Sequence, residues 1–92
     1  MPLNIRHDQE ARRFVADTPG GEAYLTYSEV GAGRLEYDYT FVPPELRGKR
    51  LGEEVAAFAL QYARDHGFRV IPSCGFVRRV AMANAEFRDL VE

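Results

Sequence analysis

The chain has 92 residues, of which 46% are hydrophobic and 28% are charged, and its formal net charge is −2 at pH 7. This length and composition are typical of one globular domain spanning 1–92, and they exclude a disordered tail. The acidic balance gives the molecule no electrostatic reason to bind nucleic acid or an anionic membrane.

The first half of the chain predicts four strands. The segments with strand patterns are Leu3–His7, Arg12–Ala16, Glu22–Val30 and Arg34–Val42. Short polar or glycine-rich turns separate them, which favours an antiparallel meander. In the fourth segment apolar side chains alternate with polar ones, so we expect the apolar set on one face. That set is Leu35, Tyr37, Tyr39 and Phe41.

A double proline and a basic glycine loop follow the fourth strand. The prolines cannot continue a strand ladder or a helix, so the chain must turn there. Gly48 and Gly52 allow main-chain N–H groups to approach a small ligand, and a helix N-terminus attracts anions. Three basic residues surround the glycines: Arg47, Lys49 and Arg50. Taken alone, the loop fits an anion site and an ordinary strand-to-helix connection about equally well.

The second half predicts a helix, a strand and a second helix. Apolar residues from Arg50 to His66 fall at helical spacing, namely Leu51, Val55, Phe58, Ala59 and Tyr62. Gly67 is expected to end this helix, and Phe68–Ile71 forms a short strand that Pro72 terminates. Because it follows a helix, this strand is expected to lie parallel to the fourth. The fold class is therefore α+β, with a meander, a crossover helix, a fifth parallel strand and a C-terminal helix.

This order of elements predicts a cleft. A parallel strand added to a meander opens a crevice at the carboxyl ends of the fourth and fifth strands, beside the helix N-terminus. The loop from Val42 to Gly52 and the residues from Pro72 to Gly75 both reach that place. We therefore expect the anion site and the single cysteine, Cys74, to lie close together.

Four segments carry a resemblance to a known family: Val42-Pro43-Pro44-Glu45-Leu46-Arg47-Gly48-Lys49-Arg50-Leu51-Gly52, Ala63-Arg64-Asp65-His66-Gly67, Val70-Ile71-Pro72-Ser73-Cys74 and Glu86-Phe87-Arg88-Asp89-Leu90-Val91. In their order they resemble the small single-domain GNAT-type N-acetyltransferases over nearly the whole chain. In that superfamily a loop written Q/R-x-x-G-x-G/A binds the pyrophosphate of acetyl-CoA through backbone N–H groups, and the pantetheine arm lies between the fourth and fifth strands.

The resemblance implies acetyl-CoA as co-substrate and no metal. Arg47 matches the first motif residue and Gly52 the last, while the middle glycine of the motif falls on Arg50. The Arg50 side chain would either obstruct the loop or add a charge-assisted contact to phosphate. The cofactor-binding residues implied are Phe41, Val42, Arg47, Gly48, Lys49, Arg50, Leu51, Gly52 and Cys74.

The resemblance also implies acetyl transfer to a primary amine, which needs a base and an acid. Relatives often read His-Thr-Glu-Val where this chain reads Tyr39-Thr40-Phe41-Val42. The remaining candidates are Glu36 and Asp38, the phenols of Tyr37 and Tyr39, and Cys74. Carboxylates and tyrosines on a strand also serve as plain surface and core residues. A helix that begins beside Cys74 would favour the thiolate, although an inert buried cysteine is the commoner case.

We therefore expect an acetyl-CoA-dependent N-acetyltransferase whose acceptor amine belongs to a small molecule or a protein, and which is a monomer or homodimer. A catalytically degenerate CoA-binding or protein-interaction module of the same fold is the alternative. A nucleic-acid module is disfavoured by the acidic balance. The chain has no apolar run that predicts a membrane span or a signal peptide, and its single cysteine suits a reducing cytoplasm.

Overall fold

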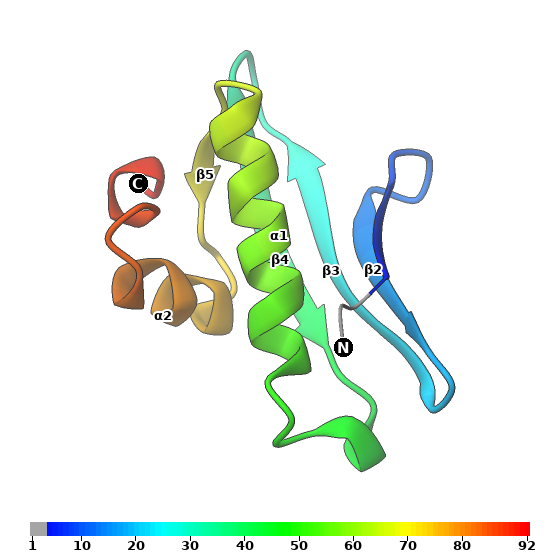
Figure 1. Cartoon of the computed structure of the whole chain (residues 1–92). Helices are drawn as coiled ribbons and strands as arrows, with labels where there is room; N and C mark the ends of the chain where they lie inside the picture. The colour runs from blue at the N-terminus through cyan, green and yellow to red at the C-terminus, as the bar shows by residue number, and fades with distance from the viewer. Residues whose placement is uncertain (1–3) are drawn as a thin grey trace.

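The computed structural model describes residues 4–92, in which five strands form one mixed sheet and a long helix lies against it (Figure 1). The strands are β1 (Ile5–Asp8), β2 (Arg13–Thr18), β3 (Gly21–Glu29), β4 (Arg34–Phe41) and β5 (Arg69–Ile71). The helices are α1 (Leu51–Asp65) and α2 (Gly75–Ala83), with 3-10 turns η1 (Pro44–Leu46) and η2 (Arg88–Leu90). The predicted α+β fold is confirmed; Leu3, the first residue of the first predicted strand, lies outside the described residues.

The strands follow one another across the sheet in chain order, β1-β2-β3-β4-β5. The first four are antiparallel neighbours, joined by short turns such as the two residues between Thr18 and Gly21. β5 pairs with β4 in parallel, which requires a long connection, and α1 provides it. The predicted meander and crossover helix are therefore confirmed, with boundaries that differ by one or two residues.

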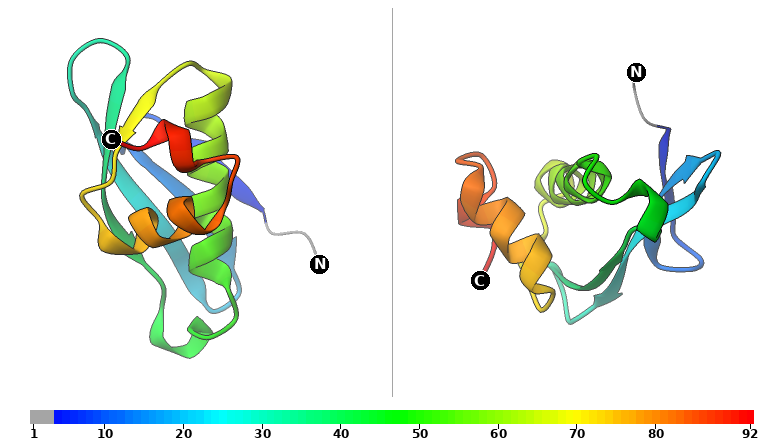
Figure 2. Two further views of the ribbon diagram at one scale, coloured as in Figure 1. Left: turned by 90° about the vertical axis from the view of Figure 1, so that its left-hand side faces the viewer. Right: turned by 90° about the horizontal axis from the view of Figure 1, so that it is seen from below.

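α1 lies in the concave side of the curved sheet, and α2 packs beside it near β5 (Figure 2). Seven residues of α1 are buried: Leu51, Gly52, Val55, Ala56, Ala59, Leu60 and Ala63. Four of these seven are glycine or alanine, and the larger Leu60 and Val55 are fully buried in the core. Phe58, expected in the buried stripe, is 39% exposed instead and only meets Phe14 edge-on, with ring centroids 6.1 Å apart. Gly67 follows the helix with φ +75°, the left-handed conformation expected of a terminating glycine.

A β-bulge in β4 changes which side chains face the helix. Thr26 pairs with Tyr39 and Tyr27 with Tyr37, so Asp38 is an extra residue without a partner on β3. Since side-chain direction alternates along a strand, one inserted residue reverses the faces beyond it. The expectation that Leu35, Tyr37, Tyr39 and Phe41 share one face is therefore wrong. Leu35 and Tyr37 are buried under α1, whereas Tyr39 is 52% exposed on the outer face and Phe41 lies there beside Tyr24.

Tyr37 is the largest fully buried side chain. Its hydroxyl donates a hydrogen bond of 2.6 Å to the Ala59 carbonyl oxygen in α1, which ties the sheet to the helix. Burial raises the pKa of Tyr37 above its ordinary value. Tyr37 therefore belongs to the core, and its candidacy as a phenolic acid in a functional site is wrong.

The C-terminal segment returns to the sheet beside β5. Val91 forms a parallel bridge with Val70, and the Glu92 N–H donates to the Val70 carbonyl oxygen at 2.9 Å. The Glu92 carboxylate also pairs with the Arg34 guanidinium at 2.7 Å. These contacts hold the short β5 between β4 and the end of the chain. Among residues 4–92 no helix combines the length and hydropathy that crossing a membrane requires.

Replacing Tyr37 with phenylalanine removes the buried hydroxyl and keeps the ring. We expect the free energy of unfolding to fall by about 1 kcal/mol, the usual net contribution of one such hydrogen bond. Urea denaturation monitored by circular dichroism measures it. Tyr39→Phe is the matched control, because Tyr39 is half exposed, and its effect should stay within about 0.5 kcal/mol. Equal effects of the two substitutions would contradict the assigned role of the Tyr37 hydroxyl.

Candidate functional site

A wedge opens between β4 and the chain that follows β5. The two strands pair only from Arg34 to Glu36, because β5 ends at Ile71 and a proline follows. One further bond continues the contact: the Cys74 N–H donates to the Tyr37 carbonyl oxygen at 3.0 Å. Beyond that point β4 runs on to Phe41 without a strand on this side, so its edge faces the start of α2.

Three polar side chains mark the closed end of this wedge. The Ser73 hydroxyl donates a hydrogen bond to the Glu36 carboxylate, which fixes the direction of that carboxylate. The Cys74 sulfur lies 3.7 Å from the Thr40 hydroxyl oxygen. Consecutive residues after β5 therefore meet β4 on its two faces: Ser73 bonds Glu36 on the outer face, and Cys74 contacts Thr40, which the bulge turns toward the helix side. We predicted that Cys74 would lie beside the anion loop; its sulfur contacts Thr40 of β4 instead.

The basic glycine loop joins the open end of the wedge to α1. Two of its residues are left-handed, Gly48 with φ +82° and Arg50 with φ +63°. The Arg47 guanidinium donates to the Val42 carbonyl oxygen at 3.1 Å, which holds the loop closed. No side chain caps α1 at Arg50, so the first N–H groups of the helix lack a side-chain acceptor. The positive end of the helix dipole thus faces the loop.

Gly52 has a packing reason to be glycine. It is buried in the first turn of α1, and an added Cβ would lie 3.0 Å from Cζ of Phe76 and 3.2 Å from Cγ2 of Val42. The end of β4, the start of α1 and the start of α2 therefore meet at this residue. The last glycine of the motif permits this close approach.

Three adjoining cavities line this end of the molecule, and Phe76 borders all three. One, of about 290 Å³, is lined by Tyr39, Thr40, Phe41, Val42, Arg47 and Phe76. The next, of about 250 Å³, lies in the loop and is lined by Val42, Leu46, Arg47, Gly48, Arg50, Leu51, Gly52, Glu53 and Phe76. The third, of about 310 Å³, lies between α1 and α2. Because neighbours share lining residues, the three form a continuous track around the N-terminus of α1.

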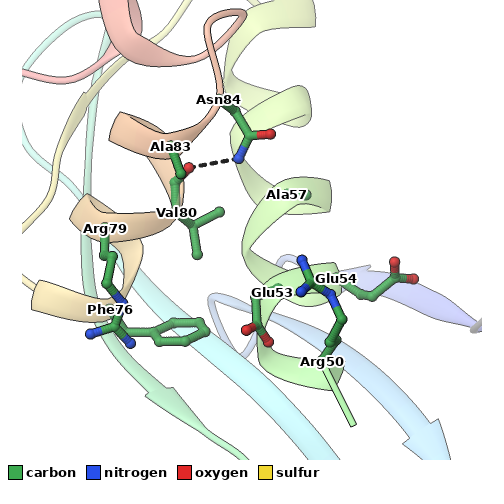
Figure 3. Close-up of a pocket in the computed structure, with 9 residues that line it drawn as sticks. All are labelled: Arg50, Glu53, Glu54, Ala57, Phe76, Arg79, Val80, Ala83 and Asn84. Carbon is green, nitrogen blue, oxygen red and sulfur yellow. Dashed lines mark hydrogen bonds between the residues drawn. The ribbon is translucent and has the colours of Figure 1, made fainter. Parts of the chain in front are cut away.

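The cavity between α1 and α2 carries mixed charge (Figure 3). The Arg50 side chain runs along the first turn of α1 between Glu53 and Glu54. Across the cavity the Arg79 guanidinium lies 5.3 Å from the centroid of the Phe76 ring, a cation–π contact. Sequence reasoning did not place Phe76 or Arg79 at this site: it gave Phe76 only as part of the second helix, and Arg79 only as a basic residue of the disfavoured nucleic-acid module. Their spacing of three residues, which places both on one helix face, was the available signal.

Most of the predicted binding residues line this track. Phe41, Val42, Arg47, Gly48, Arg50, Leu51 and Gly52 do so, and Tyr39 lines the cavity nearest the wedge. Lys49 is exposed and borders none of the three cavities. Cys74 lines none of the three cavities, but its sulfur contacts Thr40, which lines the cavity nearest the wedge. Within residues 4–92 no group of three histidine, cysteine or acidic side chains is arranged to hold a metal ion.

The sequence profile described as GCN5-related N-acetyl-transferase matches residues 13–90 of the chain. The chain belongs to this family. Among curated relatives, protein NATD1 from Bos taurus is 26% identical over 85 residues, covering 90% of this chain and 75% of the bovine protein. NATD1 from Homo sapiens is 25% identical over 85 residues, with the same coverage of 90% and 75%.

The solution structure of a GCN5-like protein from Staphylococcus aureus shows the same fold. It superposes with a TM-score of 0.75 and covers 98% of this chain and 88% of its own, at 24% sequence identity. The identity is low, so the structural match supports the arrangement of strands and helices expected of a GCN5-related protein and leaves the side chains of the site to be argued from this chain.

Arg50 has a left-handed backbone conformation that glycine adopts at lower cost, so the effect of Arg50→Gly on the free energy of unfolding can be predicted. Because such a conformation costs a non-glycine residue roughly 1–2 kcal/mol, Arg50→Gly should keep or raise the free energy of unfolding, by up to about 1 kcal/mol. Arg47→Gly is the matched control, since Arg47 has an ordinary φ of −70°. It should destabilise the protein by about 0.5–1 kcal/mol. Chemical denaturation of both variants tests this, and equal losses would contradict it.

Proposed function

We propose that the protein binds acetyl-CoA along the track around the N-terminus of α1 and transfers its acetyl group to a primary amine. The observation that carries the proposal is the continuity of the track. It runs from a strand edge without a partner, through an uncapped helix N-terminus, to a cavity with two arginines. Membership of the GCN5-related family supports it.

The loop residues fit a diphosphate. Space is open at Gly48, where an added Cβ would meet nothing within 4 Å. Backbone N–H groups at Gly48, Lys49, Leu51 and Gly52 would hold the anion, as at other uncapped helix N-termini. Two arginines, Arg47 and Arg50, line the loop cavity with a single carboxylate, Glu53, so positive side chains outnumber negative ones there.

The flanking cavities fit the two ends of an extended ligand. The free edge of β4 beyond Tyr37 would accept hydrogen bonds from an amide-bearing arm, between walls formed by Phe41 and Phe76. The cavity between α1 and α2 would hold a nucleotide end, because Arg50 and Arg79 supply charge for a phosphate and Phe76 supplies an aromatic face.

Acetyl-CoA supplies an acyl thioester that an uncharged amine can attack. Glu36 is assigned as the base that removes a proton from the amine, because its carboxylate lies at the closed end of the wedge and Ser73 orients it. Cys74 Sγ and Thr40 Oγ1, across the wedge, are assigned to return a proton to the leaving sulfur. Tyr39, on the adjoining cavity, is the second candidate for this acid.

Binding is tested by thermal unfolding and calorimetric titration with acetyl-CoA. Ligand at ~100 times its dissociation constant should stabilise the protein by about 2.7 kcal/mol. We expect Gly48→Ala to weaken binding at least tenfold, because a methyl group and a strained backbone enter the anion loop. Gly67→Ala is the matched control: Gly67 has a similar φ of +75° and equally open surroundings, but lies at the other end of α1.

Two results would contradict the binding proposal. One is the absence of any rise in melting temperature at millimolar acetyl-CoA. The other is an equal loss of affinity in Gly48→Ala and Gly67→Ala, which would assign the effect to general destabilisation rather than to the loop.

Transfer is tested by release of the CoA thiol in the presence of a panel of amines. Glu36→Gln should lower kcat by about 100-fold or more while leaving acetyl-CoA affinity unchanged, as expected for loss of a general base. Asp38→Asn, at the neighbouring carboxylate of the bulge, is the control and should keep most activity. Cys74→Ala removes one of the two groups assigned as the acid, so it should lower kcat and keep acetyl-CoA affinity, with Thr40 left to donate the proton; an acetyl group found on Cys74 by mass spectrometry would instead indicate an acetyl-cysteine intermediate.

A CoA-binding module without catalysis is the second candidate. The sequence favours it at one place: Tyr39 and Phe41 stand where relatives often carry histidine and glutamate, and both lie on the outer face of β4. This candidate predicts a thermal shift with acetyl-CoA and no thiol release with any amine. Turnover that depends on Glu36 would exclude it.

A further inference from the structure

A fourth cavity lies at the opposite end of the molecule. It has a volume of about 190 Å³ and is lined by Gln9, Arg12, Tyr27, Glu29, Leu35, Tyr62 and Phe68. These residues come from the β1–β2 turn, the β3–β4 hairpin and the C-terminal end of α1, all at the end of the sheet opposite the glycine loop (Figure 1). Since α1 has 15 residues, its two ends are about 22 Å apart. This cavity is therefore separate from the track proposed for acetyl-CoA.

Opposite charges stand on its rim. In the part of the chain that the structure describes, neither Arg12 nor Glu29 has an ion-pair partner. Both charges act on the Tyr27 hydroxyl: burial raises the pKa of Tyr27 most, Tyr62 and the carboxylates of Glu29 and Asp8 raise it further, and the Arg12 guanidinium lowers it. The two charges thus flank one hydroxyl and remain available to a ligand.

The cavity floor is rigid. The Tyr27 hydroxyl lies 2.6 Å from Nε2 of His7, within hydrogen-bond distance. The His7 ring stacks on Phe14 with centroids 4.4 Å apart and meets Tyr62 edge-on at 4.5 Å. Burial lowers the pKa of His7, with a smaller effect of His66 in the same direction, which favours the neutral ring at pH 7. Tyr27 is therefore held in one orientation beneath the charged rim.

Arg12 occupies a backbone conformation that suits glycine. Its φ is +56°, and the turn fixes it: the Ala11 N–H donates to the Asp8 carboxylate at 3.1 Å and the Arg12 carbonyl oxygen accepts from the Tyr27 N–H at 3.0 Å. A strained residue of this kind persists only where its surroundings impose it, and such residues cluster at functional sites. The turn therefore holds the Arg12 side chain at the rim despite the cost of its backbone conformation.

We propose that this cavity binds a small zwitterion, a free α-amino acid. The Arg12 guanidinium would bind the carboxylate, Glu29 the ammonium, and the Tyr27 hydroxyl would donate or accept a hydrogen bond between them. Tyr62 and Phe68 border a cavity whose surface is otherwise mainly polar, which suits the charged groups of the ligand. A simple anion would be repelled by Glu29 and a simple cation by Arg12, so the rim favours a ligand that carries both charges. The proposal does not depend on acetyl-CoA binding.

The test is a titration of the ¹⁵N-labelled full chain by NMR, with glycine and L-leucine as probes. We expect saturable shifts of the backbone amides of Arg12, Tyr27 and Glu29. L-leucinamide, which lacks the carboxylate, and N-acetyl-L-leucine, which lacks the ammonium, should each bind at least tenfold more weakly than L-leucine. Absence of saturable shifts with both amino acids, or equal binding of a blocked analogue, would overturn the proposal.

Substitutions distinguish a loss of ligand binding from a loss of folding stability. Arg12→Gly removes the guanidinium and also relieves the left-handed backbone, so it should keep the melting temperature while weakening L-leucine binding at least tenfold. Glu29→Gln should weaken it similarly. Glu10→Gln, in the same turn but outside the cavity lining, is the control and should bind as the unaltered chain does. Unchanged binding in both Arg12→Gly and Glu29→Gln would overturn the assignment.

Discussion

The parallel pairing of β4 with β5 ends after three residues, and the layout of the proposed acyl-transfer site depends on that early end. A proline stops β5, while β4 continues to Phe41 beside an N–H donated by Cys74. A longer ladder would occupy the edge of β4 and remove the wedge. The C-terminal bridge from Val91 to Val70 stabilises this short strand from its other side. The short β5 is thus kept in place, and the edge of β4 beyond it stays free to pair with a ligand.

The bulge at Asp38 has a second effect on the same strand. By inserting one residue, it sends Tyr39 and Phe41 to the outer face and turns Thr40 toward Cys74. At the other end of β4, before the bulge, Tyr37 still points into the core and bonds to α1. A single strand therefore contributes Leu35 and Tyr37 to the core before the bulge, and it contributes Glu36 on its outer face and Thr40 beyond the bulge to the proposed site.

Local electrostatics differ from the overall charge. The chain is acidic, yet the loop before α1 collects three positive side chains at the positive end of a helix dipole that no side chain caps. At the far end of α1, charges of both signs, on Arg12, Glu29 and Asp8, act on the Tyr27 hydroxyl beside the neutral His7 ring. The two ends of one helix thus present different electrostatic environments, one suited to an anion and the other to a dipolar ligand.

The sequence by itself determined the α+β class, the meander, the crossover helix and the position of the basic glycine loop, because strand alternation, helical spacing and glycine position are local signals. Only the tertiary structure decided which face Tyr39 and Phe41 occupy, since a bulge depends on how β3 pairs with β4 and leaves no mark in the alternation. The tertiary structure also places Phe76 and Arg79 in the lining of the cavity between α1 and α2. It forms the cavity lined by Arg12 from three segments that are distant in the sequence. Such contacts arise from packing between elements, which single-segment patterns do not contain.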